Sequence, residues 1–464
     1  MNEKAKATLS VQWHITSRCM KHCRHCYMFE NERYRTEIEN ELKFSDMLKI
    51  LDDIEDFEKK WNFAVNDFFV TGGDPVLNQD YMKLLLEIKN RGKKSYLMGN
   101  PETLTAEVLD NLKTAEIQQM QMSLDGLEKL HDFYRGKGNF ATTIKALELL
   151  DKHGIIATIM FTLTGENKHE LIPLMKFVSR ETKAKGFAFD LVCGVGSAKD
   201  IPMQLTKEEL KDIFTDYLTE KKRIKEERIP IRISEKSKFF QLLHFNNNEF
   251  YPYDYDEFIA TGGCYTGFTC YTILADGSVA ACRRFPTIIG KMPEEKIEKI
   301  FFENDLLKRF RRASSYEKCG SCAFYKNCRG CPAVTYGYFN DPFRENPLCF
   351  KDLIDRKIDD KKWKSPSIDT TMQEEADIVR SMLHNQYSAD YDQFTSNDDF
   401  LLLVGTLISS KEERNKFFVS PNKYVNDYYA NAKLSDKEIA YACYYVECVL
   451  QNRIPNPIKY ALDM

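Results

Sequence analysis

Three cysteines lie close together near the start of the chain, at Cys19, Cys23 and Cys26, and an aromatic residue, Tyr27, follows directly. Their spacing is C-x3-C-x2-C, and thiolates are ligands for zinc and for iron–sulfur clusters. Structural zinc takes four ligands, and the first third of the chain has no fourth cysteine. A four-iron cluster held by three thiolates keeps one iron open to a small molecule. The spacing therefore favours an open cluster over a zinc site completed from elsewhere or a group of buried thiols.

A glycine-rich turn, T-G-G-D-P, contains Gly72, Gly73 and Asp74 and follows the apolar run Phe68–Val70. Together with the cysteine spacing, this turn resembles the radical S-adenosylmethionine (radical SAM) enzymes. The resemblance implies that the three cysteines hold a [4Fe–4S] cluster and that SAM chelates its open iron. It also implies that a G-G-E-P-like strand end contacts the amino group of SAM. Here the aspartate stands where glutamate is commoner.

The resemblance implies further SAM contacts at the ends of later strands. Ser123 and Asp125 would bind the ribose hydroxyls, and Tyr27 would lie beside the adenine. Arg135 would pair with the SAM carboxylate, because a guanidinium fork suits a planar carboxylate. Asn100 also falls at a strand end and is a candidate contact. The alternatives are an ordinary Asp-Gly turn at residues 125–126 and a surface arginine in a glycine-rich loop. The sequence identifies no catalytic residue.

Apolar runs alternate with amphipathic helical patterns up to about residue 235. The predicted strands are Leu9–Thr16, Asp67–Val70, Ser95–Gly99, Gln118–Leu124, Ile156–Leu163 and Gly186–Val192. Repeated strand–helix units predict an α/β fold with a parallel sheet and right-handed crossovers. Six units are too few for a closed eight-stranded barrel, so we expect an open, partial (β/α)6 barrel. The chemistry of such barrels gathers at the carboxyl ends of the strands, where the candidate residues fall.

Eight further cysteines lie between residues 264 and 349, around a predicted hairpin at residues 271–281. This pattern resembles the SPASM domain, which carries two auxiliary [4Fe–4S] clusters. By that resemblance, one cluster takes Cys264, Cys270, Cys282 and Cys331. The other takes Cys319, Cys322, Cys328 and Cys349. Two structural zinc sites, or disulfides, are the alternatives, and the C-x2-C spacing of Cys328 and Cys331 is one residue shorter than usual.

Arg283 directly follows Cys282. SPASM-containing sulfatase maturases carry an aspartate at this position, so a formylglycine-generating role is disfavoured. Cys193 ends the last predicted strand and is expected to be an ordinary buried cysteine.

The bulk composition narrows the possible partners. Lys and Arg number 66 against 70 Asp and Glu, a net charge of −4, which gives no reason to expect nucleic acid or an anionic membrane. The start of the chain lacks the apolar segment of a signal peptide, and no run of about 18 apolar residues occurs. We therefore expect a cytoplasmic protein in which eleven of the 14 cysteines, those in the motifs, are metal ligands rather than disulfide partners.

We predict three parts in the chain. Residues 1–235 form the radical SAM partial barrel, and residues 236–356 form the SPASM domain after a loop or linker at His244–Tyr255. Residues 367–464 form a helical region of unknown role, in which we recognise no family resemblance. It could be a structural cap on the barrel, a partner-binding module or an oligomerisation surface, and our hypothesis is that it contacts the peptide or shapes its channel.

The resemblance implies a radical SAM oxidoreductase that matures a ribosomally made peptide. With SAM and three [4Fe–4S] clusters, it would generate a 5′-deoxyadenosyl radical and oxidatively form a thioether or another crosslink. Its expected partners are the precursor peptide and an external electron donor of the flavodoxin or ferredoxin type. The alternatives are a radical SAM enzyme acting on a protein side chain or small molecule, and a non-catalytic metal-binding scaffold.

Overall fold

The computed structural model of the chain describes residues 7–29, 33–201, 205–252, 263–360, 363, 365–384, 398–429, 434 and 436–450. In this part of the chain, no helix is both long enough and apolar enough to cross a membrane.

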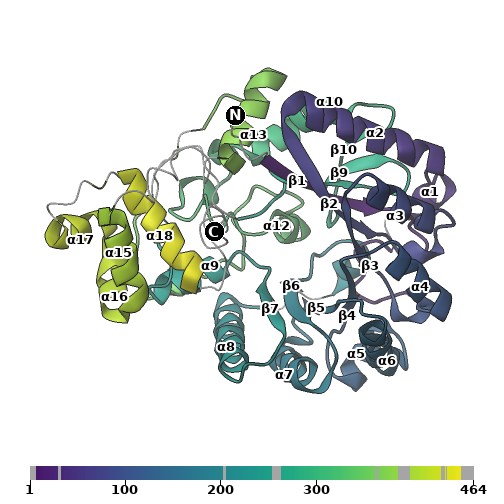
Figure 1. Cartoon of the computed structure of the whole chain (residues 1–464), viewed down its shortest axis with the longest axis horizontal. Coiled ribbons are helices and arrows are strands. Elements are labelled where there is room, and N and C mark those ends of the chain that lie inside the picture. The colour runs from purple at the N-terminus through teal and green to yellow at the C-terminus, as the bar shows by residue number, and fades with distance from the viewer. Residues whose placement is uncertain are drawn as a thin grey trace.

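One curved ten-stranded sheet organises the molecule, in the order β10-β9-β8-β1-β2-β3-β4-β5-β6-β7 (Figure 1). The first seven strands are β1 (Ala7–His14), β2 (Phe63–Thr71), β3 (Lys94–Met98), β4 (Gln119–Ser123), β5 (Ala157–Leu163), β6 (Gly186–Leu191) and β7 (Arg232–Glu235). They pair in parallel with their neighbours. The six predicted strands are confirmed, and the sheet is open as expected. The seventh strand, β7, was not predicted, because its four residues are mostly polar and show no apolar alternation.

Helices follow the strands and cover the outer face of the sheet (Figure 1). They are α1 (Arg33–Glu39), α2 (Phe44–Trp61), α3 (Tyr81–Asn90), α4 (Ala106–Thr114), α5 (Glu128–Arg135), α6 (Asn139–Lys152), α7 (Leu171–Glu181) and α8 (Lys207–Glu226). Each amphipathic helix buries its apolar face against the sheet, as Ile50, Leu51 and Ile54 of α2 do. This arrangement leaves the carboxyl ends of the parallel strands together at one rim.

The second cysteine region continues the same sheet. Strand β8 (Cys270–Ile273) pairs in parallel with β1, and β9 (Ser278–Cys282) and β10 (Phe285–Lys291) extend it in antiparallel fashion. Its helices are α10 (Ile297–Glu303), α11 (Asp305–Phe310) and α12 (Pro332–Phe339). One apolar core contains residues from both regions. The predicted division at residue 235 therefore marks a change in the sequence pattern, and the two sides share one core.

The linker predicted at His244–Tyr255 is wrong for its first residues. Helix α9 (Phe240–Asn246) occupies this place, and its aromatic residues Phe240 and Phe245 are buried in the shared core. His244 is buried with them because two carboxylates, Glu235 and Glu249, accept its ring N–H groups. Residues 253–255 lie outside the described part of the chain.

The C-terminal region is helical, as expected. Its helices are α13 (Met372–His384), α15 (Asp398–Ser409), α16 (Lys411–Val419), α17 (Pro421–Tyr428) and α18 (Asp436–Leu450). Helix α13 packs on the main body, where its Glu375 pairs with Arg311 and Arg312 in full burial. The later helices form a second core around Leu403, Phe418 and other residues, on the left of Figure 1.

Candidate radical SAM and iron–sulfur sites

The first cysteine loop is fixed to the end of β2 by close backbone contact. The N–H of Gly73 donates to the carbonyl of Thr16 at 2.9 Å, and the N–H of Asp74 donates to that of Arg18 at 2.8 Å. A Cβ atom at Gly72 would lie 2.1 Å from the Thr16 oxygen, and one at Gly73 would lie 2.2 Å from the Arg18 oxygen. Only glycine fits, so the two glycines position the loop, and their contact with SAM stays a prediction.

Hydrogen-bond donors surround the three sulfurs of this loop. Asn100 Nδ2 donates to Cys19 Sγ at 3.4 Å, and Arg135 Nη1 donates to Cys23 Sγ at 3.7 Å. The backbone N–H two residues after Cys19, and the one two residues after Cys26, each donate to the sulfur at 3.4 Å. Burial raises the pKa of Cys19 to about 11. A metal cluster must therefore displace the thiol protons, and the surrounding donors stabilise the thiolates that result.

Asp74 is fully buried at the rim and only partly satisfied. Its Oδ2 accepts from Thr103 Oγ1 at 2.9 Å, whereas Oδ1 has no hydrogen-bond partner among the described residues although Asn100 lies near. Burial raises the pKa of this carboxyl. A buried acceptor without a donor is costly, and the amino group of SAM is the donor that the sequence resemblance implies here. The residues present therefore fit SAM.

Asp125 and Arg135 form a buried ion pair that the sequence did not reveal. Arg135 Nε donates to Asp125 Oδ2 at 2.5 Å, the backbone N–H of Thr162 donates to Oδ1 at 2.9 Å, and His25 Nε2 lies 3.2 Å away. Burial alone would raise the pKa of Asp125, but Arg135 and His25 outweigh it and hold that pKa well below its usual range. The pair links the strand end after β4 to the cysteine loop. Its contacts with SAM ribose and carboxylate stay predictions.

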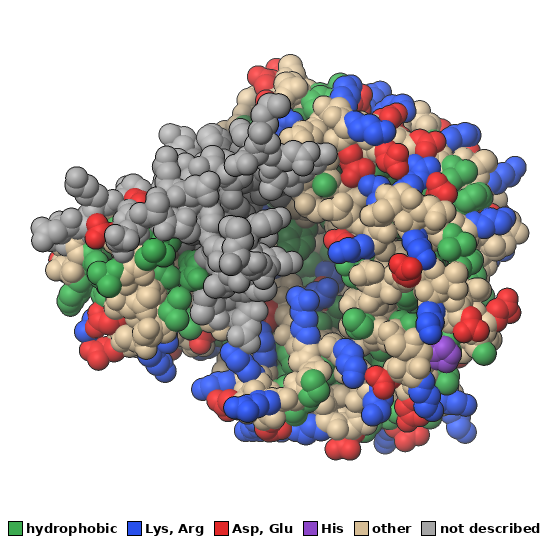
Figure 2. Space-filling view, in the orientation of Figure 1, with side chains coloured by type: hydrophobic (Ala, Val, Ile, Leu, Met, Phe, Trp, Pro, Cys, Tyr) green, Lys and Arg blue, Asp and Glu red, His purple; other side chains and the backbone are tan. Residues whose placement is uncertain are grey.

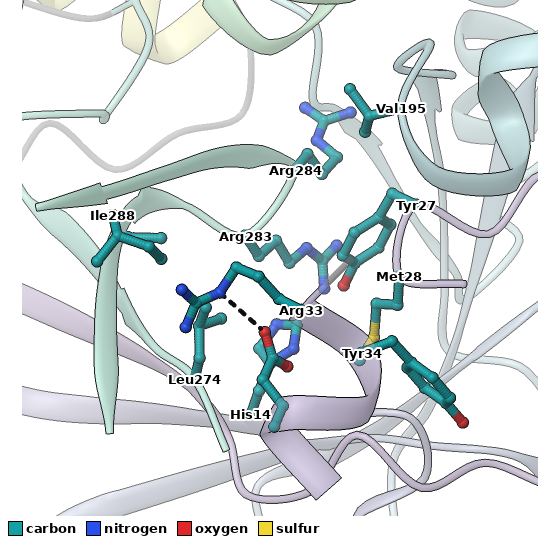
Figure 3. A pocket seen from close by; sticks show the side chains of 12 residues that line it. His14, Tyr27, Met28, Arg33, Tyr34, Val195, Leu274, Arg283, Arg284 and Ile288 are labelled. Carbon is teal, nitrogen blue, oxygen red and sulfur yellow. Dashed lines mark ion pairs between the residues drawn. The ribbon is translucent and has the colours of Figure 1, made fainter. Parts of the chain in front are cut away.

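A pocket opens between the first cysteine loop and the β8–β10 strands (Figure 3). Tyr27 is half-buried in its wall, and its ring lies edge-on to His14 at 6.3 Å between centroids. Ser123 is half-buried at the end of β4 and does not line this pocket. The lining residues are His14, Tyr27, Met28, Arg33, Tyr34, Glu37, Val195, Leu274, Ala280, Arg283, Arg284 and Ile288.

The second region brings cysteines from distant points of the chain close together. Burial raises the pKa of Cys264, and the neighbouring sulfurs of Cys331 and Cys282 raise it further. Burial likewise raises the pKa of Cys270 to about 12, with Cys282 and Cys264 beside it. Arg284 Nη2 donates to the Cys331 sulfur at 3.6 Å. The first group is thus gathered, and its role as a cluster ligand set stays a prediction.

The other group gathers in the same way. Burial raises the pKa of Cys319 to about 12, and the sulfurs of Cys349 and Cys322 raise it further. Cys328 is fully enclosed, and the same three sulfurs are its neighbours. The short spacing between Cys328 and Cys331 does not prevent their separation into two groups, because Arg329 and Gly330 both adopt positive φ angles and turn the chain sharply between them.

Cys193 lies beside Cys331 of the first of these two groups, and the sequence analysis did not predict this contact. The residue is buried just after β6, and its thiol lies close enough to Cys331 for each to affect the pKa of the other. The chain can approach so closely because Gly194 lies against Gly337 of α12, where a Cβ would be 2.6 Å from the backbone N of Gly194. Its place at a strand end, directly before a glycine, was the only available signal.

None of the described cysteines forms a disulfide. No three His, Cys, Asp or Glu residues in the described ranges are close enough to hold one metal ion.

Comparison with known proteins identifies both regions. Residues 13–178 match the Radical SAM superfamily, and residues 264–332 match SPASM, an iron–sulfur cluster-binding domain. The chain is 24% identical over 351 residues to the AdoMet-dependent heme synthase of Nitratidesulfovibrio vulgaris, covering 73% of this chain and 91% of that protein. It is 26% identical over 335 residues to the subtilosin biosynthesis protein AlbA of Bacillus subtilis, covering 70% of this chain and 67% of AlbA.

A solved structure shares the fold. Streptococcus suis SuiB bound to its precursor peptide SuiA superposes with a TM-score of 0.60 at 20% identity, covering 74% of this chain and 76% of SuiB. These matches agree with the open parallel barrel, the three-cysteine loop at its rim and the eight cysteines that follow. Residues 13–178 thus carry a radical SAM domain, and residues 264–332 carry a SPASM domain that binds iron–sulfur clusters in its family.

Proposed function

We propose that this protein is a peptide maturase that oxidatively modifies a ribosomally made precursor, using SAM and three [4Fe–4S] clusters. The observation that carries the proposal is the place of the pocket. The pocket is lined by Tyr27 and Met28, directly after Cys26, and by Arg283 and Arg284, directly after Cys282. A substrate residue in this pocket would lie between the SAM-binding loop and the first auxiliary group of cysteines.

The bound groups would supply one-electron reduction of SAM on one side and an electron acceptor on the other. The residues of the chain would hold the bound groups in place and line the space between them. Asn100 and Arg135 stabilise the thiolates of the first loop, and Arg284 stabilises that of Cys331. His14 and Tyr27 line the space between, and burial holds both in their neutral forms, because it lowers the pKa of His14 to about 3 and raises that of Tyr27 to about 12.

Relatives support a peptide substrate. AlbA is a bacteriocin biosynthesis protein, the mycofactocin maturase MftC of Mycolicibacterium smegmatis matches 71% of the chain at 23% identity, and SuiB has been solved with a precursor peptide. A second candidate is a carboxylated tetrapyrrole. It is supported by the heme synthase relatives and by the three arginines that line the pocket.

Co-expression with each short peptide encoded beside the gene tests the proposal. We expect one peptide to lose the mass of two hydrogen atoms for each bond formed. When that peptide carries deuterium at the modified residue, deuterium should appear in 5′-deoxyadenosine. Conversion of an iron porphyrin, with all neighbouring peptides unchanged, would contradict a peptide role and favour the second candidate.

A further inference from the structure

Arg283 reaches across the barrel mouth without a carboxylate partner. It follows β9 directly, is half-buried, and its Nη1 donates to the Met98 sulfur at the end of β3, 3.2 Å away. A thioether is a weak acceptor, whereas a guanidinium has five N–H donors. Within the described ranges Arg283 forms no ion pair. Most of its hydrogen-bonding capacity is therefore unused in a partly desolvated place.

The other arginines of the pocket are already paired. Arg284 binds Asp190 at 2.9 Å, and Arg33 binds Asp276 at 2.9 Å (Figure 3 shows its second pair, with Glu37). These carboxylates are thus engaged and do not neutralise Arg283. Arg283 is therefore the arginine of the pocket lining that has no carboxylate partner among the described residues.

Two neutral groups accompany this charge. His14 is buried in the same lining, and its Nε2 has no hydrogen-bond partner among the described residues. Arg283 is close enough to His14 and to Tyr27 to affect the titration of both. Each can supply one hydrogen-bond donor without adding charge. A guanidinium flanked by an imidazole and a phenol is a donor set for an anion.

We propose that Arg283 binds a carboxylate of the substrate, with His14 and Tyr27 as accompanying donors, and so orients the substrate beside the first cysteine loop. This inference rests on the proposed function for the place of the substrate. The carboxylate belongs either to an acidic residue or C-terminus of a peptide, or to an acid-bearing small molecule. A planar carboxylate accepts two parallel N–H bonds from one guanidinium, which fixes both its position and its plane.

Binding to the reconstituted full-length protein with SAM, under anaerobic conditions, tests this inference. One arm uses a pool of synthetic capped peptides that carry Glu or Gln at a single varied position. The other arm uses coproporphyrin III and its tetra-amide. We expect the wild type to prefer the carboxylate form by about tenfold or more, which corresponds to one charge-assisted hydrogen bond.

The variant Arg283→Gln should lose this preference while keeping the wild-type iron content. Arg283→Lys should keep part of it, because the charge remains but the fork is lost. Arg91→Gln is the matched control: this arginine pairs with Asp52 and Glu55 at the far end of α3 and should leave the preference unchanged.

The outcomes separate the inference from the proposed function. A carboxylate preference that depends on Arg283 and is seen only with the porphyrin supports the inference and contradicts the peptide role. Peptides that bind without any Glu preference overturn the inference and leave the peptide role standing. A wild type that prefers no carboxylate in either arm, or an Arg283→Gln variant with the full preference and full iron content, also overturns it.

Discussion

The two cysteine regions are held in place by different means. The first loop lies at the rim of the partial barrel. There Gly72 and Gly73 contact the backbone of the loop, and Asn100 and Arg135 contact its sulfurs. The second region shares the sheet through β8–β10, but its segment from residue 311 to residue 350 has one helix of eight residues, α12, and short turns. We expect the shape of this segment to depend on the two groups of four cysteines, which come from distant points of the chain.

The difference in support goes together with a difference in the expected number of cysteine ligands, three in the first loop and four in each group of the second region. Three sulfurs on a preformed rim leave one cluster position open, which is what SAM chelation needs. Four sulfurs close a site and can replace secondary structure as the source of stability, because metal binding then contributes folding free energy. We therefore expect loss of a first-loop ligand to abolish chemistry but not folding, and loss of a second-region ligand to impair folding.

The largest effect should follow Cys322→Ala in the second region. Iron should fall from about twelve to about eight atoms per chain, as one four-iron cluster is lost. Soluble yield should fall several-fold, because the turns around Cys319 and Cys349 lose their common anchor. Iron and sulfide analysis of purified protein measures the first effect. Wild-type iron and yield, or zinc in place of the iron, would contradict the two-group assignment.

A smaller loss is expected in the barrel when its buried pair is broken. Asp125→Ala leaves Arg135 buried without its carboxylate, which costs about 3–5 kcal/mol of the free energy of unfolding. Urea unfolding of the apoprotein measures this cost. Asp46→Ala, which removes an exposed pair with Lys49, should cost at most about 1 kcal/mol. Equal effects of the two substitutions would show that the Asp125 pair does not anchor the rim.

The free energy of unfolding should depend on pH through His244, which lies in α9 where the two regions join. Burial opposes the charge on His244, but Glu235 and Glu249 outweigh it and raise its pKa to about 9. A raised folded-state pKa stabilises the protein fully below the unfolded value of about 6.5, and this stability is lost as pH rises toward 9. The free energy of unfolding should fall by up to about 3 kcal/mol across this window. His244→Gln should remove this slope, and an unchanged slope in that variant would refute the assignment.

The smallest effect concerns Cys193. Its thiol lies beside that of Cys331, and hydrogen bonds to cluster sulfurs raise the reduction potential. Cys193→Ala should lower the potential of the neighbouring cluster by on the order of 40 mV, equivalent to one hydrogen bond of about 1 kcal/mol. Potentiometric titration followed by electron paramagnetic resonance measures this shift. Loss of the cluster itself would instead make Cys193 a ligand.

The sequence was informative where function depends on local pattern. Apolar periodicity located six strands, and the cysteine motifs located the radical SAM and SPASM domains. It failed where contacts join distant segments: Arg283 and Met98 are 185 residues apart, and Cys193 meets Cys331 through a close contact of two glycines. It also failed at β7 and α9, whose short or aromatic sequences carry no clear period and are fixed by burial in the shared core.

The pairing of Asp125 with Arg135 shows the same limit. Both residues were selected from motifs for separate contacts with SAM, and only the turn of α5 back toward β4 brings them within 2.5 Å. Residue types and spacing identify which groups gather at a rim. They do not specify which of those groups bind one another.

Reductive cleavage of SAM by a variant without the first loop's cysteines tests the central claim most directly. Cys19, Cys23 and Cys26 are changed together to alanine, and 5′-deoxyadenosine is measured with dithionite as reductant. We predict no product, a folded protein, and about eight irons per chain from the two remaining clusters. Product at the wild-type rate, or loss of all iron together with the fold, would contradict the division into one open and two closed sites.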